Sequence, residues 1–214
     1  MNLKVMLGEA ISAARRRKNL IVFFIATHVV FLVFGEWMVA KEFPGVLFLR
    51  AEQLKEIQNL PYLKPLTGIL ADNLALKILY TFFFNLIFGA FLSTTVTGVV
   101  FVLPYLIAVW RSFIIGILIY NMDVSPALIT VFYGTFVLEF GAYCVSSAIG
   151  MDLGLSVVWP GRKGTRSRRE AFSLAARDGA RLYLLVIIIL FIAAIWEMSW
   201  LHYLGPLKLP DNIN

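Results

Sequence analysis

Long stretches without a formal charge dominate the pattern of apolar and polar residues along the chain. Seventeen uncharged residues separate Lys18 from Glu36, and none of the 33 residues from Ile78 to Trp110 is Asp, Glu, Lys or Arg. Because the hydrocarbon core of a bilayer is about 30 Å thick, a crossing helix needs about 20 such residues. The pattern therefore predicts an all-α, polytopic membrane bundle of five transmembrane helices, at about residues 20–40, 74–97, 99–121, 126–150 and 181–200.

The longest apolar stretch, residues 73–122, exceeds what one crossing needs. As a single helix it would be about 75 Å long, so we expect it to fold back on itself. The turn should lie between Ser93 and Pro104, where threonines and a glycine weaken helix propensity. Asp72 and Asn73 are the candidate N-caps of the first helix. The alternative is a re-entrant hairpin that never crosses, which would need protein or water around its non-helical backbone.

The composition agrees with a membrane protein and excludes two other classes. Apolar residues make up 60% of the chain and charged residues 15%, and the mean hydropathy is +0.81. A soluble domain is about 45–50% apolar and about 25% charged, so an ordinary soluble enzyme and a disordered chain are both excluded. The single cysteine, Cys144, and the two histidines, His28 and His202, are too few for a tetrahedral zinc site. We expect neither a metal nor a cofactor.

Sequence motifs typical of catalysis are missing from the chain. It contains no Gly-x-Ser-x-Gly elbow, no His-Glu-x-x-His and no phosphate-binding loop. A hydrolase that uses Ser146 or Ser147 with His28 is conceivable only because any bundle can bring two side chains together. We therefore expect a protein without catalytic activity, in which His28 is a packed polar side chain.

Basic residues predict the orientation of the bundle. Of the 19 Lys and Arg residues, five lie in residues 1–18 and seven in residues 162–181. Positive charge near span ends favours the cytoplasmic side, so both segments should be cytoplasmic. Two segments on the same side need an even number of crossings between them, and the four predicted spans meet that condition. The N-terminus is then inside and the C-terminus outside. We therefore expect a multi-pass protein of the cytoplasmic (cell) membrane. A cleavable signal peptide is rejected, because no small-residue cleavage site ends the first apolar run.

Four segments surround the spans of the predicted membrane domain, residues 20–200. Residues 1–19 show the pattern of an amphipathic helix that suits the inner leaflet, and a partner protein is the alternative surface. The basic segment 160–180 includes Ser167-Arg168-Arg169-Glu170, which matches a capping box, and topology explains its charge without nucleic acid. The external segment 42–72 is too short for its own core, so it should cap the bundle and offer the largest external surface to a partner. The external tail comprises residues 201–214.

Two ionisable residues lie at span depth, where a charge is costly and points to a function or a partner. Glu139 is near the middle of the fourth predicted span, and Arg111 is about halfway along the third. We expect an ion pair between them that fixes helix register. The alternatives are a polar path for a solute or proton, and an Arg111 that reaches the cytoplasmic surface. Asn85, in the second span, should hydrogen-bond a neighbouring helix.

The fourth predicted span has one side built of small residues. Ala142, Ser146, Gly150 and Gly154 recur every four residues, and Gly141 adds to the same small side. Such a stripe lets two helix backbones approach closely. It predicts a packing face that meets either another span of the same chain, which we favour, or a second copy in a homo-oligomer.

Several short runs, taken in order, resemble the stage II sporulation protein M family. They are Phe84 to Ala90, Phe113 to Gly116, Gly134 to Ala142 and Ala148 to Gly154. The resemblance covers about residues 73–200, and Glu139 followed by the small-residue stripe is its most specific element. Members typically carry Asn-Gly where this chain has Arg111-Ser112, and histidine where it has Tyr133.

The resemblance implies a non-catalytic integral membrane scaffold or assembly factor that helps localise cell-envelope enzymes. The expected partners are then the lipid bilayer and membrane or envelope proteins, cell-wall hydrolases among them. The alternative function is a channel or transporter component for a small solute or ion, with Glu139 and Arg111 in its path.

Overall fold

The structure is a computed structural model that describes residues 2–122 and 124–204. Within these residues the chain is helical and contains no strand, so the prediction of an all-α protein is confirmed. Residues 205–214 of the predicted tail lie outside the described residues. The elements, in chain order, are α1 (Leu3–Arg16), α2 (Lys18–Ala40), α3 (Pro44–Asn59), α4 (Lys64–Thr67), α5 (Leu74–Phe84), η1 (Asn85–Val96), η2 (Thr97–Val99), α6 (Leu103–Ile119), α7 (Pro126–Val158), η3 (Pro160–Lys163) and α8 (Arg168–Leu204).

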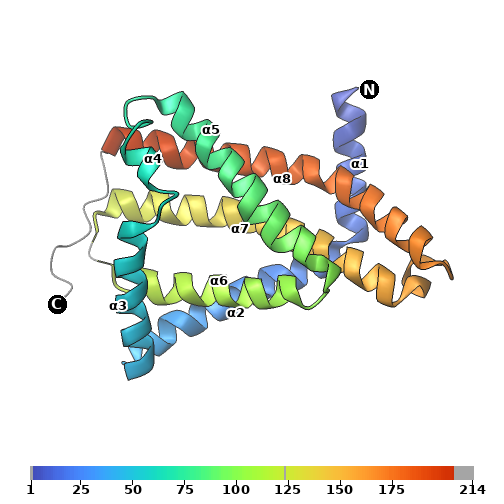
Figure 1. The fold of residues 1–214 in the computed structure, drawn as a ribbon, viewed down its shortest axis with the longest axis horizontal. Coiled ribbons are helices and arrows are strands. Elements are labelled where there is room, and N and C mark those ends of the chain that lie inside the picture. Colours follow the sequence, from blue (N-terminus) through green and yellow to red (C-terminus); the bar gives the residue numbers. More distant parts are fainter. Residues whose placement is uncertain (1, 123, 205–214) are drawn as a thin grey trace.

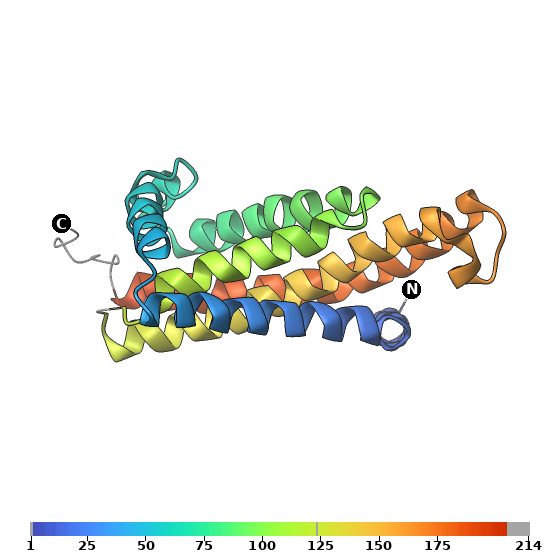
Figure 2. The same cartoon turned by 90° about the horizontal axis from the view of Figure 1, so that it is seen from below.

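The helices form a bundle in which α2, α5 with η1, α6, α7 and α8 run alongside one another (Figures 1 and 2). Successive segments run in opposite directions, while α1 lies across one end of the bundle and α3 across the other. We call these the α1 end and the α3 end. The closest pairs are α7 with α8 and α2 with α6, and α5 and η1 pack on α8 and α7.

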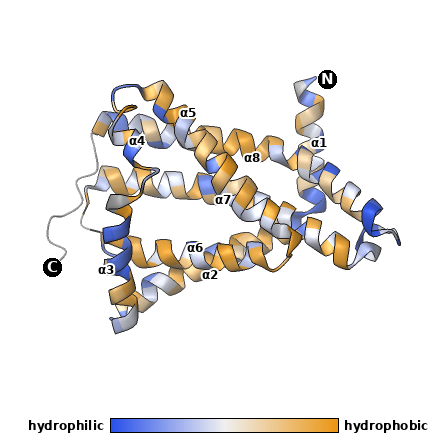
Figure 3. Ribbon diagram, in the orientation of Figure 1, coloured by the Kyte–Doolittle hydropathy of each residue, from blue (hydrophilic) through white to orange (hydrophobic). Residues whose placement is uncertain are grey.

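Apolar residues cover the middle of the bundle, and hydrophilic residues gather on α3 and where α7 joins α8 (Figure 3). Four helical stretches of the described residues are long and apolar enough to cross a membrane: Lys18–Ala40, Leu74–Val99, Pro126–Val158 and Arg168–Leu204. The fifth, α6, is apolar and has 17 residues. At about 1.5 Å per residue, α6 spans about 25 Å, slightly less than the bilayer core.

The long helices α7 and α8 supply most of the core. Leu182, Val186 and Leu190 of α8 are almost fully buried against Phe140 and Ile149 of α7. Lipid is as apolar as these side chains, so close packing, rather than removal from water, holds the two helices together. Both helices also continue beyond the predicted spans 126–150 and 181–200, because α7 runs on to Val158 and α8 extends from Arg168 to Leu204.

The start of α8 follows the capping pattern of the sequence in part. The Ser167 hydroxyl accepts the backbone N–H of Glu170 at 3.4 Å, as the capping box predicts. The Glu170 carboxylate does not bond back to Ser167, because it accepts the Thr165 hydroxyl instead. This cap fixes the first turn of a helix that runs without interruption into the last apolar segment.

The segment from Leu74 to Val99 changes helix type halfway along. Its first turn is capped by the Asn73 side chain, which accepts the Leu76 N–H at 3.0 Å. From Asn85 the helix continues as a π-helix and then as a short 3₁₀ turn, and the chain reverses before Pro104, which lies in the first turn of α6. The reversal falls in the interval that the sequence predicts. Hydroxyls of the π-helical stretch and of the first residue of η2 bond to carbonyls four residues back, a competition that distorts helices: Ser93 to Gly89, Thr94 to Ala90 and Thr97 to Ser93.

At the α3 end, the segment 42–72 is attached to the bundle at two points. Val46 of α3 is buried with Val39 of α2 and Ile117 of α6. The Arg50 guanidinium donates to the Tyr120 carbonyl over 2.5 Å. The segment thus caps the α3 end, with α3 turned across the direction of the spans (Figure 1).

At the α1 end, a network of ion pairs attaches α1 to the long helices. Arg17 reaches Asp152 of α7 at 2.7 Å and Asp178 of α8 at 2.9 Å. Lys163 reaches the same Asp152 oxygen at 2.6 Å, and Arg16 reaches Asp178 at 2.7 Å. Burial lowers the pKa of the Lys163 ammonium, and its hydrogen bond to Asp152 opposes that shift. The amphipathic helix therefore packs on protein here, with buried Ala10 and Ala13 on the side that contacts α8.

Candidate functional site

Glu139 is joined to the π-helical stretch by a short hydrogen bond. The Nδ2 amide of Asn85 donates to Oε1 of Glu139 over 2.5 Å. Asn85 is the first residue of η1 and Glu139 stands on α7, so the bond links two of the apolar segments. Bonds of this kind between membrane helices contribute about 0.6–2 kcal/mol.

Arg111 does not form the expected ion pair with Glu139, because no nitrogen of Arg111 lies within 4.0 Å of a carboxylate oxygen among the described residues. Its guanidinium lies over the ring of Tyr143, 4.3 Å from the ring centroid. It also donates to the Ser93 hydroxyl at 3.1 Å and to the Gly89 carbonyl at 3.5 Å. A cation over an aromatic face is stabilised by about 0.5–2 kcal/mol.

Tyr143 separates the two charged groups. It lies on α7 one helical turn after Glu139, and its hydroxyl interacts with the Glu139 carboxylate. Gly89 leaves room for that ring, because an added Cβ would lie 2.6 Å from the Tyr143 hydroxyl. Arg111 and Glu139 are therefore linked through Tyr143 rather than directly.

The small-residue stripe packs against the π-helical stretch of the same chain. An added Cβ on Gly150 would collide with the Thr94 carbonyl, and one on Gly154 would collide with the Gly98 carbonyl. The hydroxyls of Thr94 and of Ser146, which belongs to the same stripe, lie 2.8 Å apart, within hydrogen-bond distance. Gly141 takes no part in this contact, since nothing lies within 4 Å of an added Cβ there.

His28 is packed in the core between α2 and α7. Its Nδ1 lies 2.8 Å from the Phe24 carbonyl, and its ring meets the edge of Phe140 at 4.7 Å between centroids. The Sγ atom of Cys144 lies 3.6 Å from the same nitrogen. Ser146 is bonded to Thr94 instead, so no described contact joins it to His28.

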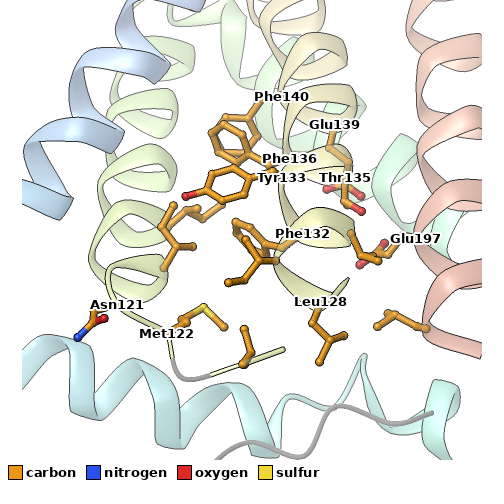
Figure 4. A pocket seen from close by; sticks show the side chains of 16 residues that line it. Asn121, Met122, Leu128, Phe132, Tyr133, Thr135, Phe136, Glu139, Phe140 and Glu197 are labelled. Atoms are coloured by element: carbon orange, nitrogen blue, oxygen red, sulfur yellow. The ribbon is translucent and has the colours of Figure 1, made fainter. Parts of the chain in front are cut away.

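A cavity of about 450 Å³ lies between α6, α7 and α8 towards the α3 end (Figure 4). Glu139 and Thr135 of α7 lie on one wall, and Glu197 of α8 points towards them from the facing helix (Figure 4). The remaining lining is largely apolar and aromatic, with Phe132, Phe136 and Phe140 prominent. The cavity therefore combines two carboxylates with apolar walls.

Sequence reasoning missed Glu197, because it stands near the end of the last predicted span and resembles an interfacial charge. The structure brings it inside, since α8 continues to Leu204. The neighbouring Trp196 fixes this part of α8 on α7: its Nε1 donates to the Val131 carbonyl at 3.2 Å, and its ring packs over Gly134. The only signal in the sequence was the long apolar stretch that leads directly into Trp196-Glu197.

Comparison with known families agrees with this arrangement. The profile of the family described as stage II sporulation protein M matches residues 20–200. The chain belongs to the stage II sporulation protein M family. The match includes the five apolar segments and the α3–α4 cap, and it leaves out α1. Searches of curated proteins and of solved structures gave no match.

Family membership and the apolar helices together identify the chain as an integral membrane protein of helical architecture. Its charged residues inside the apolar region, Arg111, Glu139 and Glu197, are then in a medium where unpaired charge is costly. The structure offsets that cost through Asn85 and Tyr143 for Glu139, and through Tyr143, Gly89 and Ser93 for Arg111.

Proposed function

We propose that the protein is a non-catalytic scaffold or assembly factor of the cytoplasmic membrane that helps localise cell-envelope enzymes. In this proposal the chain crosses the bilayer five times, with the α1 end in the cytoplasm and the α3 end outside. The antiparallel course of the five segments and the basic residues near the α1 end support that orientation. Family membership supports the scaffold role.

The observation that carries the proposal is the attachment of α3 across the end of the bundle. Its attachment through Val46 and Arg50 makes the segment a platform rather than a mobile loop. The same helix keeps Phe48 69% exposed, beside exposed Leu47. Exposed aromatic and apolar residues on a rigid element are typical of surfaces that bind proteins.

Site-specific photocross-linking from native membranes tests this proposal. A photoreactive phenylalanine analogue at Phe48 should yield a discrete protein adduct, expected to be a cell-wall hydrolase. The matched control is the same analogue at Val137 of α7, a side chain that is 66% exposed in the apolar middle of the bundle and should yield lipid adducts. Only lipid adducts from position 48 would contradict a scaffold role for α3.

The cavity with Glu139 favours a second candidate function, a channel or transporter component. For transport, a solute would have to move from this cavity towards the α1 end and pass Arg111. It would also have to separate Gly150 and Gly154 of α7 from the η1–η2 turn, with which they are in close contact. A reconstituted flux assay with Glu139→Gln separates the two functions, because a transporter should lose flux. An unchanged flux argues against transport.

A further inference from the structure

We propose that the cavity between α6, α7 and α8 is a binding site for a small organic cation, an amine or quaternary ammonium with an apolar body. Three features converge there: the carboxylates of Glu139 and Glu197, an unpartnered hydroxyl of Thr135, and a wall of aromatic rings (Figure 4). The site is separate from the α3 surface, so its failure would leave the scaffold proposal unaffected.

No positive charge in the described part of the chain contacts either carboxylate directly, and Arg111 reaches Glu139 only through Tyr143. Among the described residues, no Lys, Arg or His nitrogen lies within 4.0 Å of Glu139 or Glu197. The Asn85 amide and the Tyr143 hydroxyl both interact with Glu139, whereas Glu197 has no hydrogen bond among these residues. Two like charges in an apolar setting are costly, and a cation between them offsets that cost.

Thr135 provides an independent sign of a ligand. Its Oγ1 atom is buried and has no hydrogen-bond partner among the described residues, and its side chain lines the cavity. Threonines of apolar helices ordinarily donate to a carbonyl one turn back, as Thr130 of α7 does to Pro126 at 3.0 Å and Thr27 of α2 does to Phe23 at 2.9 Å. The free hydroxyl of Thr135 is thus available to a bound group.

The size and lining of the cavity select an organic cation over a metal ion. About 450 Å³ lies within the range of small-molecule sites, which are about 300–1,000 Å³ and mostly apolar. Phe132, Phe136 and Tyr133 present rings that attract an ammonium group and pack on its apolar substituents. No group of three His, Cys, Asp or Glu residues among the described ones is placed to hold a metal ion.

The lining also indicates the route of entry. It continues past Leu128 to Asn121 and Met122, in the connection between α6 and α7 beside α3 (Figure 4). A ligand therefore reaches the carboxylates from the α3 end. In the five-span topology proposed above, that end faces the outside of the cell.

Equilibrium binding to the full chain in lipid nanodiscs tests the site. The probe is radiolabelled benzyltrimethylammonium, with binding to empty nanodiscs subtracted, and its neutral carbon isostere neopentylbenzene is the competitor. Unlabelled cation should displace the probe, whereas the isostere at equal concentration should not. Equal displacement by the two compounds, or no binding above that of empty nanodiscs, would overturn the proposal.

Variants locate the binding. Glu197→Gln should weaken probe binding by about tenfold or more, as expected for loss of a charged contact. The matched control is Glu42→Gln, an exposed residue between α2 and α3, which should bind as the unmodified chain does. Melting temperatures show whether each variant is folded. The competition between the cation and its isostere uses the unmodified chain, so it tests the site even if a variant does not fold. Unchanged binding by a folded Glu197→Gln protein would overturn the assignment.

Discussion

Two glycines of α7 lie in very different surroundings. Gly150 faces the carbonyl of Thr94 so closely that an added Cβ would collide with it, whereas an added Cβ on Gly141 meets nothing within 4 Å. The first glycine is required by the approach of two backbones, and the second is not. In a helix interior, alanine is otherwise favoured over glycine by about 1 kcal/mol.

We predict opposite effects of the same substitution at these positions. Gly150→Ala should destabilise the protein by about 1–3 kcal/mol, because backbone must move to admit the methyl group. Gly141→Ala, its matched control, should leave stability unchanged or raise it slightly. Thermal unfolding in detergent measures both effects. For a chain of this size, the melting temperature should shift by about 2–4 °C per kcal/mol of changed stability. Equal melting temperatures for the two variants would contradict the close contact.

The sequence predicts which polar residues are inside but not which of them meet. Glu139, Asn85 and Arg111 were identifiable because each interrupts an apolar stretch. Their partners depend on how the helices are rotated about their axes, which apolar periodicity does not specify. Tyr143 therefore occupies the place expected for a direct Arg111–Glu139 contact, and only the structure reveals it.

The attachment of α1 to the bundle depends on a few charged side chains. Asp152 is only 7% exposed and accepts from both Arg17 and Lys163 through one oxygen. Removing its charge leaves two partly buried cations without that partner. Breaking a buried pair in this way costs about 3–5 kcal/mol.

We predict that Asp152→Asn loosens α1 before it unfolds the bundle. Amide hydrogen exchange in residues 3–16 should accelerate, because Arg17 is the hinge between α1 and α2 and loses one of its two acidic partners. Asp72→Asn makes the same chemical change at an exposed site on the α3 side and should leave that exchange unchanged. Unchanged exchange in α1 of the Asp152→Asn protein would show that apolar packing alone holds the helix.

The positions of the helices could be predicted more fully than their lengths and types. Uncharged runs locate each apolar segment, and Asn73 and Ser167 cap helices where the sequence indicates. The extension of α7 beyond residue 150 could not be predicted from the apolar pattern, since Asp152 within it is held by ion pairs with Arg17 and Lys163. The π-helix could not be predicted either, because an apolar run has no signal for a change in hydrogen-bond spacing.

The topology of the whole molecule depends on the hairpin made by α5, η1 and α6. The 26 residues of Leu74–Val99 lead from the α3 end to a turn that lies at the α1 end in both views (Figures 1 and 2). That length suffices for a full crossing. A re-entrant hairpin would instead leave the turn at membrane depth, where backbone needs protein or water around it.

Cysteine accessibility in cells distinguishes these topologies, because Val100 in the turn is 54% exposed and the native Cys144 is buried. A membrane-impermeant maleimide should label Glu52→Cys on α3 in intact cells. It should label Val100→Cys and Arg166→Cys only after the membrane is permeabilised, since five crossings place both on the cytoplasmic side. If Val100→Cys stays unlabelled after permeabilisation while Arg166→Cys reacts, the hairpin does not cross, and α2, α7 and α8 alone span the bilayer with the same orientation of both ends.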